Sequence, residues 1–153
     1  HQTHFVLILR NTYKGVHPAQ VAFPGGKFED QDKSLKDTAI RETFEEVGVP
    51  IKHIEVLKKL TQVYIPPSNF NVHPYIGISK QTPHFIKQTD EVEAIIEIPL
   101  QHLFDDETLI KKTVSTSYSV DVEVPAFKLN NHIVWGATAM MLSEIKDLLK
   151  RLI

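Results

Sequence analysis

Cysteine is absent from all 153 residues, which excludes disulfide bonds and thiol nucleophiles and is compatible with a reducing cytoplasm, where we expect the protein. The sequence also lacks any run of about 20 apolar residues, so we expect a soluble protein that does not enter a membrane. Excess positive charge is missing too. A net charge of −2 argues against general nucleic-acid binding, which normally requires a basic face.

The length and the apolar content of 42% fit one globular domain, residues 1–153, with a single core. The chain begins at His1, without Met, inside a segment that reads as a strand. We therefore expect that an upstream segment has been removed or left out, together with any targeting signal on it.

Three glutamates lie four residues or fewer apart in a predicted helix over residues 35–47. A helix turns about 100° per residue, which places Glu45 and Glu46 on either side of Glu42 and gathers three carboxylates on one face. Such a face is stable in open solvent or around a cation, and oxygen ligands of this kind suit Mg²⁺ or Mn²⁺. Glu42, Glu45 and Glu46 are therefore the predicted metal ligands of a phosphate-chemistry site. The alternative is an ordinary solvated charged face.

The ends and faces of this helix follow from local chemistry. Ser34 is the predicted N-cap, and Gly48 followed by Pro50 is predicted to end the helix. Arg41 can reach carboxylates one turn away on either side, which predicts ion pairs with Asp37 and Glu45. An apolar row at every fourth position is predicted to face the core, so that the carboxylates face a solvated cleft; it consists of Leu35, Ala39, Thr43 and Val47.

Alternating apolar and polar residues predict strands over 70–79 and 118–126, with further strands over 5–10, 92–98 and 108–115. The stretch 11–32 is predicted to be a loop. A closing amphipathic helix is predicted from the apolar residues at helical spacing between Met141 and Leu152, and its polar face includes Lys146. This order of elements predicts an α/β fold.

The stretch from Gly26 to Val49 resembles the Nudix box, Gx5Ex7REUxEExGU with U aliphatic. The pairs Arg41-Glu42, Glu45-Glu46 and Gly48-Val49 fall in place. Gly26 lies one residue too far upstream, Asp32 stands where the box has Glu, and Thr43 occupies a normally aliphatic position. The resemblance implies an α/β/α sandwich with a mixed β-sheet between helices.

The extra residue, the Asp and the preceding HPAQVAFPGG resemble the coenzyme A pyrophosphatase branch of that family. This resemblance implies metal-dependent hydrolysis of coenzyme A to 4′-phosphopantetheine and 3′,5′-ADP. It also implies that the box Arg orients a metal-binding Glu. Another nucleoside diphosphate derivative such as ADP-ribose, or a nucleotide sensor that does not cleave its ligand, stays open.

The general base is expected among the carboxylates of the box or in a later charged turn. Glu46 or Glu45 is the first choice for the general base, supported by Arg41, and Glu91 is the second, although it can equally be part of a charged turn with Asp90 and Glu93. The physiological substrate, the choice between Mg²⁺ and Mn²⁺, and the oligomeric state, with a homodimer as one option, stay open. Residues around the box are candidates for substrate binding because of their type and position. The predicted substrate contacts are Arg10, Lys14, His17, Gly25, Gly26 and Lys27.

Overall fold

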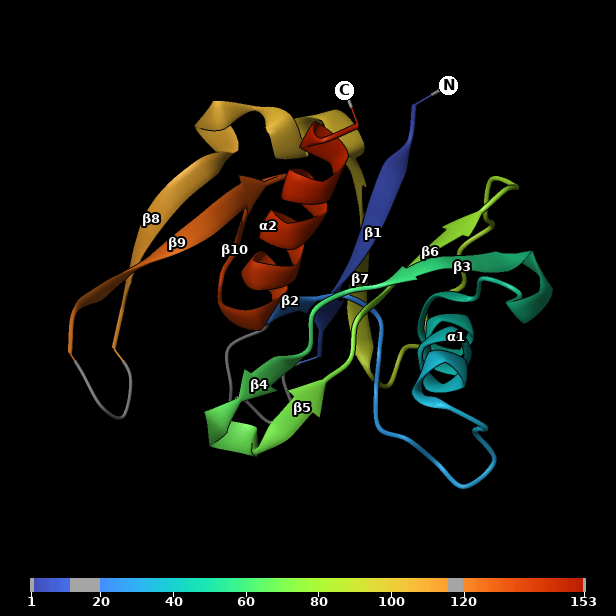
Figure 1. Cartoon of the computed structure of the whole chain (residues 1–153). Coiled ribbons are helices and arrows are strands. Elements are labelled where there is room, and N and C mark those ends of the chain that lie inside the picture. Colours follow the sequence, from blue (N-terminus) through green and yellow to red (C-terminus); the bar gives the residue numbers. More distant parts are fainter. Residues whose placement is uncertain (1, 12–19, 116–119, 153) are drawn as a thin grey trace. The chain divides into compact units, whose positions relative to one another are not determined.

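The computed structural model describes residues 2–11, 20–115 and 120–152 (Figure 1). The chain forms two compact units: Val6–Ile96, and a second unit made of His1–Phe5 together with Glu97–Ile153. The boundary between the units falls inside two strands, β1 (His4–Arg10) and β7 (Val92–Pro99). This division leaves the single-domain expectation a prediction.

The described residues of the unit Val6–Ile96 form one α-helix and short antiparallel strand pairs. In one sheet β1 lies between β2 (Val21–Ala22) and β7, and β1 pairs antiparallel with β2. Two antiparallel pairs follow, β3 (Ile54–Lys59) with β6 (Tyr75–Ser79), and β4 (Val63–Ile65) with β5 (Phe70–Val72). The helix is α1 (Leu35–Val47), and 3-10 turns occupy η2 (Ile51–His53) and η3 (Pro66–Ser68).

Helix α1 has the predicted bounds because its two ends are capped locally. The Ser34 hydroxyl accepts the N–H of Asp37 at 3.2 Å, which confirms the predicted N-cap. Gly48 adopts the left-handed conformation, with φ 79°, and donates its N–H to Phe44 O. A Cβ at Gly48 would also lie 2.8 Å from the backbone nitrogen of Ile86, so two separate constraints favour glycine there.

The core beside α1 forms where the last turn of the helix meets β1 and β7. Ile8, Val47, Val49 and Val92 are buried together, with partly buried neighbours that include Phe85. The predicted apolar row of α1 is wrong in part, because Leu35 is exposed and Ala39 and Thr43 are only half-buried. The buried residues of the helix are Thr38, Glu46 and Val47.

The other unit packs a helix against an antiparallel sheet. Its sheet has the order β10 (His132–Val134), β9 (Val122–Leu129), β8 (Leu109–Val114), and its helix is α2 (Gly136–Lys150), with 3-10 turns at η4 (Leu100–Phe104) and η5 (Asp106–Thr108). Helix α2 contacts β9 and η4. Lys146, predicted on the polar face, is buried with its ammonium 6.0 Å from the centre of the Phe127 ring.

Two strand predictions and one loop prediction need correction, and three strands were not predicted. The predicted strand over 70–79 is two strands, β5 and β6, interrupted at His73 and Pro74, and the predicted strand over 118–126 is β9, which runs from Val122 to Leu129; residues 118 and 119 lie outside the described residues. The stretch predicted as loop contains β2, and the predictions omitted β3, β4 and β10. None of the helices in the described ranges is long and apolar enough to cross a membrane.

Candidate active site

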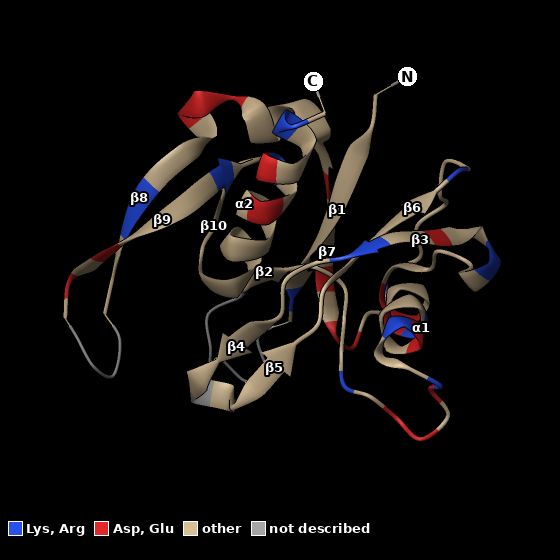
Figure 2. Ribbon diagram, viewed as in Figure 1, with Lys and Arg blue, Asp and Glu red and all other residues tan. Residues whose placement is uncertain are grey.

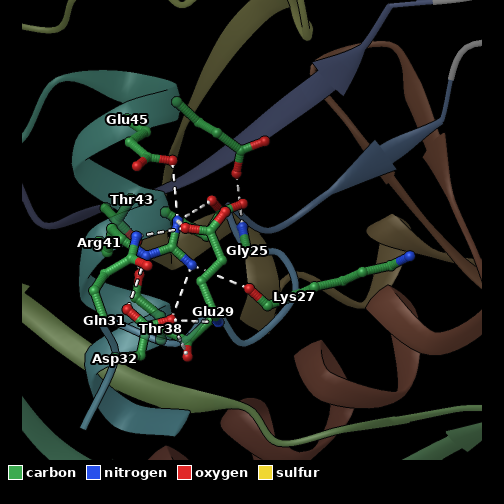
Figure 3. Close-up of polar contacts among 12 residues, drawn as sticks. Gly25, Lys27, Glu29, Gln31, Asp32, Thr38, Arg41, Thr43 and Glu45 are labelled. Carbon is green, nitrogen blue, oxygen red and sulfur yellow. Dashed lines mark hydrogen bonds and ion pairs between the residues drawn. The ribbon is translucent and has the colours of Figure 1, made fainter. Parts of the chain in front are cut away.

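Arg41 is the centre of a polar network on one side of α1 (Figure 3). Its Nε donates to Asp32 Oδ1 at 2.8 Å and its Nη2 donates to Asp32 Oδ2 at 3.0 Å, which makes a bidentate ion pair. Nη1 donates to Glu42 Oε1 at 2.8 Å and to Glu45 Oε2 at 3.1 Å. Nη2 also donates to the carbonyl oxygen of Lys27 at 3.0 Å. One guanidinium thus ties the loop before the helix to two of the predicted metal ligands.

Asp32 is the main partner of Arg41, and the sequence reasoning missed this role. Its side chain is 3% exposed and also accepts the hydroxyl of Thr38 at 2.9 Å and the N–H of Glu29 at 3.0 Å. The hydrogen bonds from Arg41 hold the pKa of Asp32 well below its usual range, and the guanidinium pKa is raised in turn. Arg41 pairs with Glu45 as predicted, whereas Asp37 is not among its ion-pair partners in the described part of the chain.

Glu46 is buried, which contradicts the prediction that all three carboxylates lie on a solvated face. The residue is 2% exposed, and its Oε1 accepts the N–H of Gly25 at 2.8 Å. Burial raises the pKa of Glu46, and the negative charges of Glu91 and Glu45 raise it further. The Gly25 N–H and the charge of Arg10 oppose this shift.

Glu42 and Glu45 complete the acidic cluster, and the two differ in exposure. The side chain of Glu42 is 14% exposed, whereas that of Glu45 is 47% exposed. Burial, the hydrogen bond with Glu45 and the charge of Glu46 raise the pKa of Glu42 to about 7, against the opposing charge of Arg41. Carboxylates therefore outnumber the one guanidinium of Arg41 in this cluster. Figure 2 marks the acidic residues of α1 in red and the basic ones in blue.

The two glycines before the helix have different roles. A Cβ at Gly26 would lie 1.8 Å from Glu42 Oε2, so the carboxylate of Glu42 occupies the space that any other residue would fill. A Cβ at Gly25 would meet nothing within 4 Å, and this residue contributes its N–H to Glu46.

The loop that carries Glu91 is attached to the end of α1 by backbone hydrogen bonds. Gln88 donates its N–H to Glu46 O at 3.1 Å, and the N–H of Glu91 bonds to Gln88 Oε1 at 3.0 Å. Asn11, which follows Arg10, donates its N–H to Glu91 O at 3.0 Å. The structure therefore brings Arg10 and Glu91 to the same carboxylate, Glu46, whose pKa both of them influence.

The remaining candidates divide into one that is described and two that are not. Lys27 contributes its carbonyl oxygen to Arg41, while its ammonium lies 5.1 Å from the centre of the Phe70 ring. Its side chain extends away from Arg41 and Glu45 (Figure 3). Lys14 and His17 lie outside the described residues.

The donor chemistry of this cluster suits a hard divalent cation. Glu42 and Glu46 present carboxylate oxygens whose pKa values are raised, so a cation would favour their ionised forms. Gly26 leaves room for the Glu42 carboxylate beside the loop. Within residues 2–11, 20–115 and 120–152 no three His, Cys, Asp or Glu side chains already lie in a ligating arrangement, and Arg41 and Gly25 hold part of the set instead.

Comparison with known proteins decides the family. A family model described as NUDIX domain matches residues 1–117. The chain belongs to the Nudix family. Relatives named "Uncharacterized Nudix hydrolase NudL", from Yersinia pestis (strain Pestoides F) and Yersinia pseudotuberculosis serotype O:1b (strain IP 31758), are 32% identical over 136 residues. These alignments cover 84% of this chain and 64% of each relative, so the chain spans less than two thirds of their length.

Membership of the Nudix family confirms the predicted α/β fold class and the Nudix resemblance of the box around Arg41 and Glu42. The two helices and the antiparallel strand pairs agree with a Nudix α/β fold. Nudix hydrolases generally use divalent metal ions, in keeping with the carboxylate oxygens gathered on α1. The family model and the names of the relatives identify the Nudix family, and neither of them mentions coenzyme A.

Proposed function

We propose that this Nudix domain hydrolyses the pyrophosphate bond of a nucleoside diphosphate derivative, with coenzyme A as the first candidate. The observation that carries the proposal is the shortage of positive charge at Glu42 and Glu46. Arg41 binds both oxygens of Asp32 and lowers the pKa of that carboxyl. Glu42 shares one nitrogen of the same guanidinium with Glu45, and Glu46 accepts one backbone N–H. The pKa values of Glu42 and Glu46 are both raised. Carboxylates that are only partly neutralised beside a glycine loop suit a site whose counter-charge arrives with the metal and the substrate.

Glu42, Glu45 and Glu46 would hold the cation, Mg²⁺ or Mn²⁺. When bound, a divalent cation supplies charge neutralisation for the diphosphate and activation of the attacking water. Arg41 fixes the orientation of Glu42 and Glu45 through Nη1, and the buried ion pair with Asp32 fixes Arg41. This arrangement extends the family inference that the box Arg orients a metal-binding Glu.

The general base is proposed from position and proton affinity. Glu46 is the first choice, because its Oε1 is held by the Gly25 N–H and its raised pKa favours proton uptake from water by Oε2. Glu45 remains an alternative. Glu91, whose charge acts on Glu46, is the second choice for the base, and Arg10 is positioned to offset phosphate charge near the same carboxylate.

The sequence immediately before the Nudix box favours coenzyme A over other substrates. The stretch HPAQVAFPGG and the additional residue between Gly26 and Arg41 are the features shared with the coenzyme A branch. ADP-ribose is the alternative substrate, because the same diphosphate chemistry serves it. A sensor that binds a nucleotide without cleaving it is a third hypothesis, which the retention of all three glutamates disfavours.

A substrate panel tests the proposal. Coenzyme A, dephospho-coenzyme A and ADP-ribose are incubated separately with the protein and Mg²⁺ or Mn²⁺, and the products are identified by mass spectrometry. We expect 4′-phosphopantetheine and 3′,5′-ADP from coenzyme A. A preference for ADP-ribose would refute the coenzyme A assignment alone. Tight binding of coenzyme A without cleavage over hours would favour the sensor.

A further inference from the structure

The β4–β5 hairpin presents an exposed aromatic ring beside the glycine loop. Phe70 opens β5 and is 44% exposed, and the ammonium of Lys27 lies 5.1 Å from its ring centre. That distance is within the range of a cation–π contact. The carboxylate cluster does not involve Phe70.

Strand register explains why this ring points where it does. Ile65 pairs with Phe70 and Val63 pairs with Val72, so these four side chains lie on one face of the hairpin. Val63 is buried, which identifies that face as the one turned toward the protein. Phe70 is therefore the exposed end of an inward-facing row, and Tyr64, paired with Asn71, lies on the other face.

The turn of the hairpin is held by hydrogen bonds of its own. Asn69 adopts a left-handed conformation, with φ 56°, and donates its N–H to Pro66 O at 3.1 Å. The Tyr64 hydroxyl donates to Asn69 Oδ1 at 2.8 Å. Phe70 thus follows a closed turn, and ordering this segment for a ligand should cost little conformational entropy.

Lys27 connects the ring to the proposed catalytic cluster. It follows Gly26 directly, and its carbonyl oxygen accepts a hydrogen bond from Arg41 at 3.0 Å. The backbone at residue 27 is therefore held by the same guanidinium that orients Glu42 and Glu45. Its side chain extends from this fixed point to Phe70.

We propose that Phe70 and Lys27 form the subsite for the nucleoside half of the substrate. The ring stacks on the nucleobase, and the ammonium pairs with the phosphate attached to that nucleoside. A base of any identity offers a π face to stack, so the subsite recognises a nucleoside as a class. This inference rests on the proposed function, because it assumes that the diphosphate lies at the acidic cluster.

Two ligands that resist hydrolysis separate the nucleoside from the diphosphate. α,β-Methylene-ADP and methylenediphosphonate share a bridged diphosphate that the enzyme cannot cleave, and only the first carries a nucleoside. Their affinities are measured by calorimetric titration with Mg²⁺ for the wild type, Phe70→Leu, Phe70→Tyr and Phe44→Leu. Phe44→Leu is the matched control, because the same substitution removes a ring of similar exposure, 47% against 44%, at a residue of α1 outside both the hairpin and the acidic cluster.

We expect Phe70→Leu to weaken α,β-methylene-ADP about tenfold, the effect of losing one base–aromatic stack, and to leave methylenediphosphonate unchanged. Phe70→Tyr should retain wild-type affinity, and Phe44→Leu should change the affinity for neither ligand. Lys27→Met should weaken α,β-methylene-ADP and reduce the salt dependence of its binding. Melting temperatures confirm that each variant is folded.

Three results would overturn the subsite. Phe70→Leu could weaken both ligands equally, which would indicate a general structural role, or it could weaken neither. Phe44→Leu could instead cause the selective loss. The proposed function is tested separately with the substrate panel, and it would fail if the wild type cleaved no member of that panel.

Discussion

Asp32 and Glu46 are both nearly buried carboxylates in one unit of the molecule, yet their pKa values shift in opposite directions. Asp32 is 8% exposed and Glu46 is 2% exposed. Two N–H groups of Arg41 bind Asp32 and lower its pKa, whereas Glu46 receives one backbone N–H and its pKa is raised by burial. Burial therefore does not decide the role of a carboxylate. What differs is the counter-charge: a bidentate arginine stabilises the charged form of Asp32, and no such pair is present at Glu46 in the described part of the chain.

The largest effect is expected from Glu46→Gln. Glutamine retains an oxygen that can accept the Gly25 N–H, so the fold should persist, with stability at pH 7 equal to or above that of the wild type. The rate of diphosphate hydrolysis should fall about 10²–10⁴-fold, because a proposed metal ligand and base is lost. Steady-state kinetics and thermal melting measure the two effects. Full activity in this variant would place the catalytic carboxylate elsewhere.

Asp32→Asn should affect both properties, in contrast to Glu46→Gln. The variant removes the charged partner of Arg41 and frees the guanidinium that holds Glu42 and Glu45. We expect a lower melting temperature and a loss of activity of about 10–100-fold, the range seen when a group that orients metal ligands is removed. A stable Asp32→Asn protein with wild-type kinetics would show that the ion pair does not position the cluster.

Gly26→Ala tests the space occupied by Glu42. The new Cβ would collide with the Glu42 carboxylate, the mobile end of a side chain that can move away, so stability should change little. Activity should fall by about tenfold because a proposed ligand is displaced. Gly25→Ala is the control, since its Cβ would meet no atom within 4 Å and its N–H is retained. Equal losses in both variants would argue against displacement of Glu42 as the cause.

Stability of the metal-free protein should fall as the pH rises from about 4.5 to about 7, the ordinary and folded-state pKa values of Glu42. In this interval the folded state retains a proton that the unfolded state releases, so rising pH favours unfolding. Denaturant titrations in EDTA should show this slope, and Glu42→Gln should flatten it. Mg²⁺ at pH 8 should restore stability, because the cation binds the folded state. An identical slope in Glu42→Gln would contradict the assignment.

The smallest effect is expected from Thr43→Val, on the same helix but outside the acidic cluster. A buried hydroxyl without a hydrogen-bond partner would make this change neutral or slightly stabilising. The hydroxyl donates to Ala39 O at 2.7 Å and the residue is half-buried, so we expect a loss of about 0.5 kcal/mol in the free energy of unfolding. Thr38→Val should cost more, because that buried hydroxyl bonds to Asp32. Urea denaturation compares the two variants.

Sequence reasoning succeeded where the determinants are close along the chain. The bounds of α1 follow from a cap at Ser34 and a glycine at position 48, and both interactions span a few residues. It failed where distant segments meet. The strand predicted over 70–79 is interrupted at His73 and Pro74, and the alternating pattern continues across the interruption because it reports side-chain polarity and not hydrogen bonding.

The sequence by itself determined the composition of the candidate site: the Nudix box, the three glutamates, Arg41 and the helix that carries them. Tertiary structure alone decided how those charges are shared. In the folded chain Arg41 binds Asp32, which lies nine residues earlier in the sequence. Glu46 is buried and accepts the N–H of Gly25, and the charges of Arg10 and Glu91 influence its pKa. Helical spacing identifies which residues share a face, but the packing of loops onto that face determines which carboxylate receives a bidentate arginine and which receives a single backbone N–H.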